Sequence, residues 1–141
     1  MPTLLPRGQF ATLFLGIYDK RKKTLLFSGA GAPNPIWIHQ NKQLSLNAEG
    51  MPLGIVTNPT YQDTIIRLTK GDSLLLYSDA LTESLTTKGL RLGDTAFKRM
   101  VKKHIVGTDP NAGLDELMQH FFKLAPPPPS DDVTAVLLKW E

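Results

Sequence analysis

The stretch SLLLYSD at residues 73–79 joins a run of apolar residues to an aspartate. A short apolar run that follows a Lys-Gly-Asp turn at residues 70–72 is typical of a strand buried on both faces. A second stretch, SDDVTAVLLKW at residues 130–140, has the reverse order, because its aspartates precede the apolar run. The two stretches predict two core strands, one of which ends at a carboxylate and the other of which begins at one.

Further strands are predicted upstream of this pair. Residues 10–18, FATLFLGIY, are apolar at almost every position, and we expect a strand with both faces buried. Shorter strands are predicted at residues 24–28, 36–39, 44–46 and 64–68. We also expect the last strand, at residues 133–140, to lie inside a sheet.

The hydrophobic period changes from strand to helix after residue 95. Apolar residues at helical spacing predict one helix over about residues 96–105, with Asp94 as its N-cap. Asp109 followed by Pro110 predicts the start of a second helix, which carries the apolar stripe of residues 114–122. Four prolines at residues 126–129 end it.

Strands joined by short turns, then two helices, then one strand indicate an α+β fold. We expect an antiparallel β-sandwich flanked by helices. The length of 141 residues suits a single domain over residues 1–141, with residues 1–8 as a flexible leader.

Charge and composition exclude several classes of protein. The net charge is +3, and the densest basic run, at residues 20–23, is predicted to be a hairpin turn. No basic stripe is interleaved with aromatic residues, so we expect no nucleic-acid binding. No apolar run is long enough to span a bilayer, and no signal peptide begins the chain. With no cysteine, the chain has neither a disulfide framework nor a thiolate metal site, and we expect a cytoplasmic protein.

Asp79 and Asp131 stand in matching contexts, at the end of one core strand and before the start of the other. If these strands are antiparallel neighbours, both carboxylates project from one rim of a sheet. Carboxylate oxygens are ligands that Mg²⁺ and Mn²⁺ prefer, and a bound ion would turn repulsion between the acids into attraction. Aspartates also end strands because they suit turns. The residues alone leave the metal site and the turn as equal alternatives. His39, His104 and His120 are far apart in the sequence and predict no metal cluster.

Six motifs occur in order along the chain. They are FATLFLGIYD (10–19), FSGAGAPNPIWI (27–38), GMPLGI (50–55), LTKGDSLLLYSDALTES (68–84), KGLRLGDTAF (88–97) and SDDVTAVLLKW (130–140). Together they resemble the bacterial branch of the PPM (type 2C) metal-dependent protein serine/threonine phosphatases. This branch contains the stage II sporulation phosphatase and the stress-response phosphatases that act on anti-sigma-factor antagonists. The resemblance covers nearly the whole chain and implies two central antiparallel sheets flanked by helices.

The resemblance also implies roles for individual residues. Asp79 matches the metal-ligating aspartate of the Asp-Gly element, and Asp131 matches the first aspartate of the Asp-Asp/Asn-x-Thr/Ser element. Asp132, Ala80 and Asn34 take supporting positions. In an intact site these ligands help to hold two Mn²⁺ or Mg²⁺ ions, which activate a water to hydrolyse phosphoserine or phosphothreonine. No covalent enzyme intermediate is implied.

The chain departs from the family pattern at three places. Ala80 stands where relatives carry Gly, and Pro33 stands where many carry His. The Gly-Gly-Asp and Asp-x-x-Gly elements that supply further metal-bridging aspartates in the N-terminal half of the family's domain do not occur. We therefore expect the C-terminal portion of a phosphatase domain, whose isolated chain is inactive if its metal ligands are incomplete. The alternative is a catalytically incomplete module that binds a regulatory protein without hydrolysing it.

The resemblance implies a phosphorylated regulatory protein as partner, such as an anti-sigma-factor antagonist. It also implies a sensor or receiver domain upstream in the parent protein. It gives no reason to expect a membrane or nucleic-acid partner for this segment.

Overall fold

The computed structural model of the chain describes residues 5–129 and 131–141. Residues 1–4 of the predicted leader, and Ser130 at the start of the SDDVT motif, lie outside the described residues. The elements in chain order are β1 (Leu13–Asp19), β2 (Thr24–Ala30), β3 (Ile36–His39), β4 (Lys42–Ser45), β5 (Thr64–Arg67), β6 (Ser73–Tyr77), α1 (Ala80–Glu83), α2 (Asp94–His104), α3 (Pro110–Leu124) and β7 (Ala135–Lys139).

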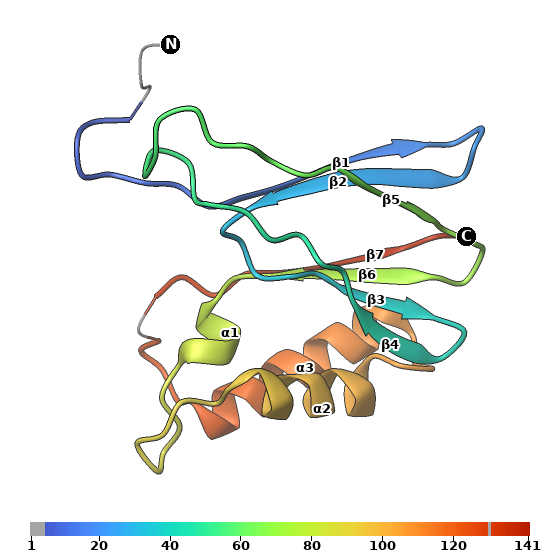
Figure 1. The fold of residues 1–141 in the computed structure, drawn as a ribbon. Helices are drawn as coiled ribbons and strands as arrows, with labels where there is room; N and C mark the ends of the chain where they lie inside the picture. The colour runs from blue at the N-terminus through green and yellow to red at the C-terminus, as the bar shows by residue number, and fades with distance from the viewer. Residues whose placement is uncertain (1–4, 130) are drawn as a thin grey trace.

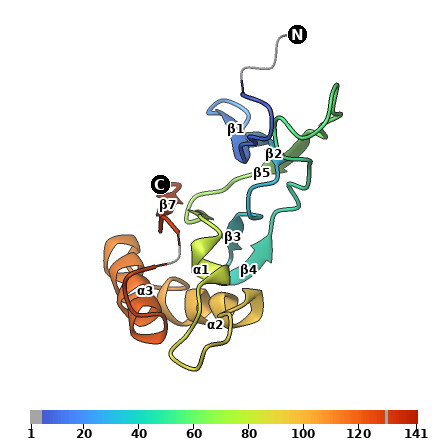
Figure 2. The same cartoon turned by 90° about the vertical axis from the view of Figure 1, so that its left-hand side faces the viewer.

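The strands of the described chain form two antiparallel sheets. One has the order β1-β2-β5, and the other has the order β4-β3-β6-β7. The two sheets are stacked, and α2 and α3 lie on the free face of the four-stranded sheet (Figures 1 and 2). The predicted α+β sandwich is confirmed, and the helices of the described chain cover one of its faces.

Strand β6 lies at the centre of this arrangement because its two faces enter different cores. Leu74 packs with residues of the three-stranded sheet, including Leu25 and Phe27. Leu75, on the opposite face, packs against the helices, where Phe97 and Phe121 are fully buried. The apolar run SLLLY is therefore buried on both faces, as predicted.

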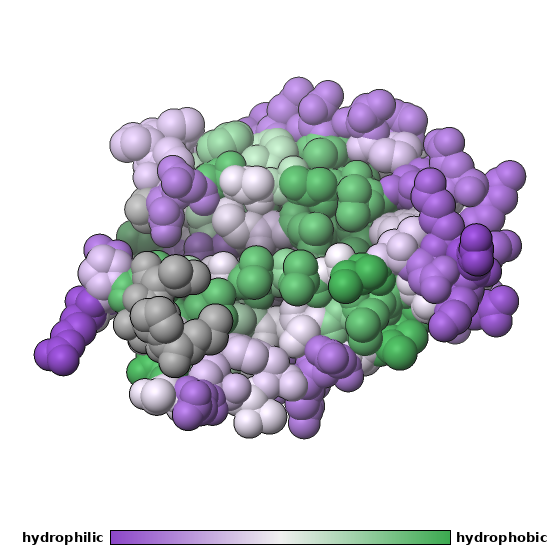
Figure 3. All heavy atoms as spheres, turned by 90° about the horizontal axis from the view of Figure 1, so that it is seen from above, coloured by the Kyte–Doolittle hydropathy of each residue, from purple (hydrophilic) through white to green (hydrophobic). Residues whose placement is uncertain are grey.

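The prediction that residues 10–18 are buried on both faces is wrong. In β1 the side chains of Leu15 and Ile17 are 57% and 62% exposed, and Ile65 of β5 is 65% exposed on the same sheet. Only one face of the three-stranded sheet packs against the other sheet, so alternate residues of β1 point outward. Figure 3 shows apolar side chains gathered on this outer face.

The last strand is also placed differently from the prediction. β7 pairs with β6 and is the outermost strand of its sheet in the described chain, so it does not lie inside the sheet. Val136 and Leu138 are 44% and 42% exposed, because they alternate with Leu137, which packs toward the helices. An apolar run alone does not distinguish such an edge strand from a central one.

The helix starts follow local signals. Asp109 accepts a hydrogen bond from the amide of Ala112 at 3.1 Å and caps α3, with Pro110 as the first helical residue, as predicted. The prediction that Asp94 is the N-cap of α2 is wrong. Gly93, with φ of 81°, is the N-cap, and Asp94 is the first residue of the helix. Its carboxylate is thereby free to face a cavity.

No helix of the described chain has the length and apolar character needed to cross a membrane.

Candidate functional site

The end of β6 and the start of β7 meet at one rim of the four-stranded sheet. Tyr77 is paired with Ala135 in the antiparallel register. Beyond this pair the amide of Ser78 donates to the carbonyl of Thr134 at 2.9 Å. The Ser78 hydroxyl donates to the carbonyl of Asp132 at 3.0 Å and accepts from the amide of Thr134 at 3.0 Å. The segments that carry the two predicted metal ligands are thus joined side by side, as antiparallel neighbours.

Asp79 occupies the N-cap position of α1, and within the described chain its carboxylate makes no capping hydrogen bond. Its carbonyl instead accepts from the hydroxyl of Thr82 at 3.0 Å, which fixes the turn. Ala80, directly behind it, is 2% exposed, so its methyl group packs into the protein. The exposed carboxylate of Asp79 faces a cavity of about 530 Å³.

This cavity is lined by parts of the chain that are distant in sequence. It lies among the ends of β6 and β2, the starts of α1 and α2, and the loop after β4. The lining residues are Gly31, Ala32, Pro33, Asn34, Ser45, Ala48, Glu49, Gly50, Tyr77, Asp79, Thr82, Glu83, Asp94 and Lys98. Four of these described residues have acidic side chains and one is a lysine, so the cavity is predominantly acidic.

Asn34 acts as a structural support in this wall. Its side-chain oxygen accepts a hydrogen bond from the amide of Ala48 at 3.0 Å and ties the loop after β2 to the loop after β4. The end of β2 and the loop after β4 approach closely at Gly29 and Gly50. A Cβ on Gly29 would lie 1.7 Å from the carbonyl oxygen of Ala48, and a Cβ on Gly50 would lie 2.1 Å from that of Gly29. Only glycine fits at this crossing.

Asp131 and Asp132 lie at the same rim but are placed differently from Asp79. Both are exposed, and Oδ1 of Asp131 accepts from the amide of Asp132 at 2.7 Å. Asp132 supports the rim through its backbone carbonyl, which Ser78 holds. The described residues that line the cavity include Asp79 but neither Asp131 nor Asp132.

The electrostatics of the cavity are dominated by unneutralised carboxylates. Burial and, to a smaller extent, the negative charge of Asp94 raise the pKa of Tyr77 to about 12. In the described part of the chain, the contacts at ion-pair distance are His39–Asp72 and His104–Glu116, and neither involves an acid of the cavity. Repulsion among such carboxylates is relieved by a cation or by protonation.

The donor chemistry of this rim fits a hard divalent cation. Carboxylate oxygens from Asp79 and Asp131 are the ligand type that Mg²⁺ and Mn²⁺ take, usually with several waters. No set of three histidine, cysteine or acidic side chains converges within the described residues to the geometry of a closed metal site. The rim therefore offers carboxylates for part of a coordination shell.

Of the residues predicted for the site, Asp79 and Asn34 line the cavity, whereas Glu49, Asp94 and Lys98 line it without having been predicted as site residues. Asp94 was interpreted only as a helix cap. The glycine before it was the available signal, because a glycine at the N-cap leaves the next side chain free. The contact between His104 Nε2 and His120 Nδ1 at 2.9 Å was also missed, because the two residues lie on different helices.

The chain is similar to proteins of known structure. The SiaA-PP2C domain of Pseudomonas aeruginosa superposes with a TM-score of 0.80 at 17% identity, over 92% of this chain and 52% of that one. The phosphatase domain of the cell fate determinant SpoIIE from Bacillus subtilis, from a Mn-presoaked crystal, superposes with a TM-score of 0.72 at 24% identity. That match covers 92% of this chain and 56% of the other. These likenesses show that the fold is that of PP2C phosphatase domains.

A curated relative is the phosphoserine phosphatase RsbU of Bacillus subtilis (strain 168). It is 26% identical over 134 residues, which are 94% of this chain and 39% of the relative. The chain thus spans well under half the length of this relative and about half of the matched structures. The family model described as Stage II sporulation protein E (SpoIIE) matches residues 1–141, so this chain belongs to the SpoIIE family of PP2C-fold proteins.

Proposed function

We propose that this chain forms part of a bacterial signalling phosphatase that hydrolyses phosphoserine or phosphothreonine on a regulatory protein. The observation that carries the proposal is the rim at which Ser78 joins the end of β6 to the start of β7. It places the carboxylate segments of Asp79 and Asp131 together, beside an acidic cavity that contains one lysine. The printed name of the relative, a phosphoserine phosphatase, supports the reaction class.

Each residue has a role in this proposal. Asp79 and Asp131 would hold Mn²⁺ or Mg²⁺, two ions in an intact site, with Asp132, Ala80 and Asn34 as supports. When bound, such ions supply an activated water and neutralise charge on the phosphoryl oxygens. Lys98, the cationic residue of the cavity wall, attracts the phosphate dianion into an otherwise acidic cavity.

A second function is favoured by one observation. Because no three metal-ligating side chains converge within the described residues, a module that binds a phosphorylated regulatory protein without hydrolysis is the alternative. In both cases we propose a cytoplasmic regulatory protein as partner, of the anti-sigma-factor antagonist type. A sensor or receiver domain in the same protein would control the site.

Hydrolysis of a phosphoserine peptide in the presence of Mn²⁺, by the natural protein that carries this sequence, tests the proposal. We expect Asp79→Asn and Asp131→Asn to lower the rate by at least about a hundredfold, since each removes charge from a ligand of the reaction centre. Asp115→Asn, on the exposed surface of α3, is the matched control and should leave the rate unchanged. Equal rates in all three variants would remove the two aspartates from the mechanism.

Calorimetric titration of this chain with Mn²⁺ separates the two functions. Binding that is lost in Asp79→Asn and Asp131→Asn, but kept in Asp115→Asn, supports the phosphatase. Absence of Mn²⁺ binding together with retained binding of the phosphoprotein supports the non-hydrolytic module.

A further inference from the structure

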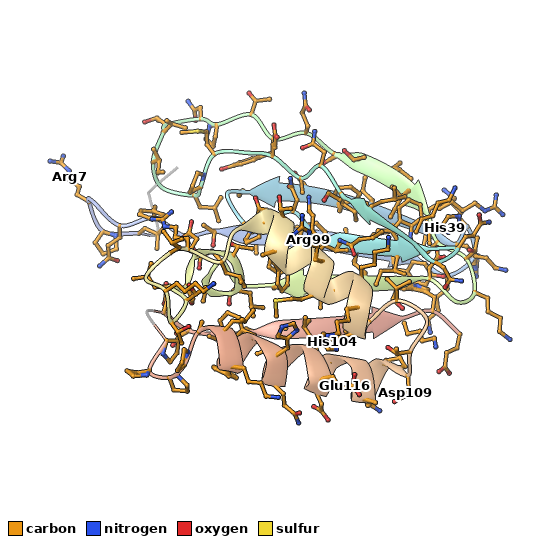
Figure 4. All side chains as sticks on the ribbon, turned by 90° about the horizontal axis from the view of Figure 1, so that it is seen from below. Arg7, His39, Arg99, His104, Asp109 and Glu116 are labelled. Carbon is orange, nitrogen blue, oxygen red and sulfur yellow. The ribbon has the colours of Figure 1, made fainter. Side chains whose placement is uncertain are left out.

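A second hollow lies on the other side of Lys98. It has a volume of about 570 Å³ and lies between the β3–β4 hairpin and helix α2. Its lining residues are Asn41, Lys42, Gln43, Leu44, Thr95, Lys98, Arg99 and Lys102. We call it the basic groove. Figure 4 shows Arg99 on α2, on the side of that helix where the hairpin lies.

The basic groove has one sign of charge. Lys98, Arg99 and Lys102 follow Thr95 at spacings of three, four and seven residues, which places them on one face of α2. Lys42 faces them from the hairpin, and no acidic residue lines the groove. Among the described residues the salt bridges lie elsewhere, so these four cations are not neutralised by the chain itself. Such a concentration of positive charge in a hollow attracts anionic ligands.

The basic groove also contains an unsatisfied polar atom. Oε1 of Gln43 is buried and has no hydrogen-bond partner among the described residues. Buried side-chain acceptors are normally paired, and Oε1 gains a partner when the Gln43 side chain turns toward the hollow and a ligand there supplies the donor. A backbone amide of an extended polypeptide is a donor of this kind, because its N–H groups have no partners of their own.

The basic groove adjoins the proposed reaction site. Lys98 lines both the basic groove and the acidic cavity that contains Asp79. A peptide bound in the basic groove therefore lies beside the cavity, on the other side of Lys98. A residue bound in the cavity would be close in sequence to the residues in the groove.

We propose that the basic groove binds an acidic, extended segment of the phosphoprotein substrate, next to the phosphorylated serine or threonine. Lys42, Arg99 and Lys102 pair with its carboxylates, and Gln43 accepts from its backbone. This inference rests on the proposed function and adds a rule of substrate choice to it. Nucleic acid is a poorer occupant, because no aromatic side chain lines the groove to stack on a base.

Fluorescence anisotropy with synthetic peptides tests the proposal on this chain. The probes are a phosphoserine peptide flanked by glutamates and the same phosphopeptide flanked by glutamines. We expect the acidic peptide to bind at least roughly tenfold more tightly at low salt, and the difference to shrink as salt is added. Equal affinities of the two peptides would overturn the proposal. So would a single-stranded oligonucleotide that binds as tightly as the acidic peptide.

A pair of charge reversals locates the binding surface. Arg99→Glu with Lys102→Glu should abolish the preference for the acidic peptide. The control, Lys20→Glu with Lys22→Glu, makes the same change of net charge on the exposed β1–β2 turn and should keep the preference. If both double variants lose the preference equally, net charge is the cause and the basic groove is not the docking site.

Hydrolysis assays on the natural protein distinguish a failure of this inference from a failure of the proposed function. The Arg99/Lys102 double variant should raise KM for the acidic phosphopeptide by roughly tenfold and leave the rate on p-nitrophenyl phosphate unchanged. If neither substrate is hydrolysed but the peptide preference depends on Arg99 and Lys102, the phosphatase proposal fails and docking stands. If both substrates are hydrolysed with unchanged KM in the double variant, docking fails and the phosphatase proposal stands.

Discussion

The hydroxyl of Ser78 donates a hydrogen bond of 3.0 Å to the backbone carbonyl of Asp132, which lies 54 positions further along the chain. The same oxygen accepts from the amide of Thr134 at 3.0 Å. One side chain therefore fixes the segment that carries Asp131 against the end of β6, next to Asp79. The rim depends on this serine in addition to the backbone pairing of β6 and β7.

Replacement of Ser78 by alanine should weaken both the fold and the rim. The substitution removes two hydrogen bonds at a partly exposed position, and we expect the free energy of unfolding to fall by about 1 kcal/mol. We also expect the free energy of Mn²⁺ binding to weaken by more than the free energy of unfolding does. The reason is that the segment that carries Asp131 is no longer held against β6 by the Ser78 side chain. Urea unfolding and calorimetry measure the two effects. Thr57→Ala, on an exposed loop, is the control and should change neither.

Replacement of Gly29 by alanine should disrupt the cavity wall. A Cβ there would lie 1.7 Å from the backbone oxygen of Ala48, so the end of β2 and the loop after β4 must move apart. We expect a loss of about 3 kcal/mol or more, measured by chemical unfolding. Gly16→Ala in β1 is the matched control. Its nearest contact would be Leu25 Cδ1 at 3.2 Å, the mobile end of a side chain, and stability should change by less than about 1 kcal/mol.

The sequence was most informative where a pattern reports both faces of an element. SLLLY is apolar at consecutive positions because β6 enters two cores, and the strand was correctly predicted. FATLFLGIY has the same local appearance, yet Leu15 and Ile17 are exposed. Burial of a face depends on which layer lies over it, and that is a property of the tertiary arrangement. A local sequence pattern therefore does not show whether a strand face is covered by another layer.

The candidate site was likewise predictable from the sequence only in part. The sequence places Asp79 and Asp131 at one rim on the condition that the adjoining strands are antiparallel neighbours, and the pairing of β6 with β7 meets that condition. The further acids of the cavity, Glu49 and Asp94, arrive from a loop and a helix start. The close crossing of backbones at Gly29 positions the loop of Glu49, and the start of α2 after Gly93 positions Asp94. No spacing rule links these positions, so sequence reasoning could not assemble the full cavity.

Asp72 should be the most sensitive carboxylate of the fold outside the cavity. It is 2% exposed and is 2.7 Å from His39 Nδ1, and it accepts from Trp37 Nε1 at 3.2 Å and from the Thr69 amide at 2.9 Å. Asp72→Ala leaves these groups without their acceptor, and we expect a loss of about 3 kcal/mol in urea unfolding. Asp115→Ala, at an exposed position of α3, should have little effect. A loss equal to that of Asp115→Ala would show that the buried network is not stabilising.

Stability should fall as the solution becomes acidic, through the contact between α2 and α3. Burial, followed by the positive charges of His104, Lys103 and Lys123, lowers the pKa of His120 from its ordinary value of 6.5. The unfolded chain then binds the proton more readily, so the stability contributed by neutral His120 is full above pH 6.5 and is lost as pH falls through its lowered pKa. The negative charge of Glu116, 3.4 Å from His104 Nδ1, partly offsets the repulsion between protonated His120 and the positive charges around it. We expect the melting temperature to fall between about pH 7 and pH 5.5, and His120→Gln to flatten this dependence, since glutamine does not titrate. An identical slope in the variant would assign the pH dependence to other groups.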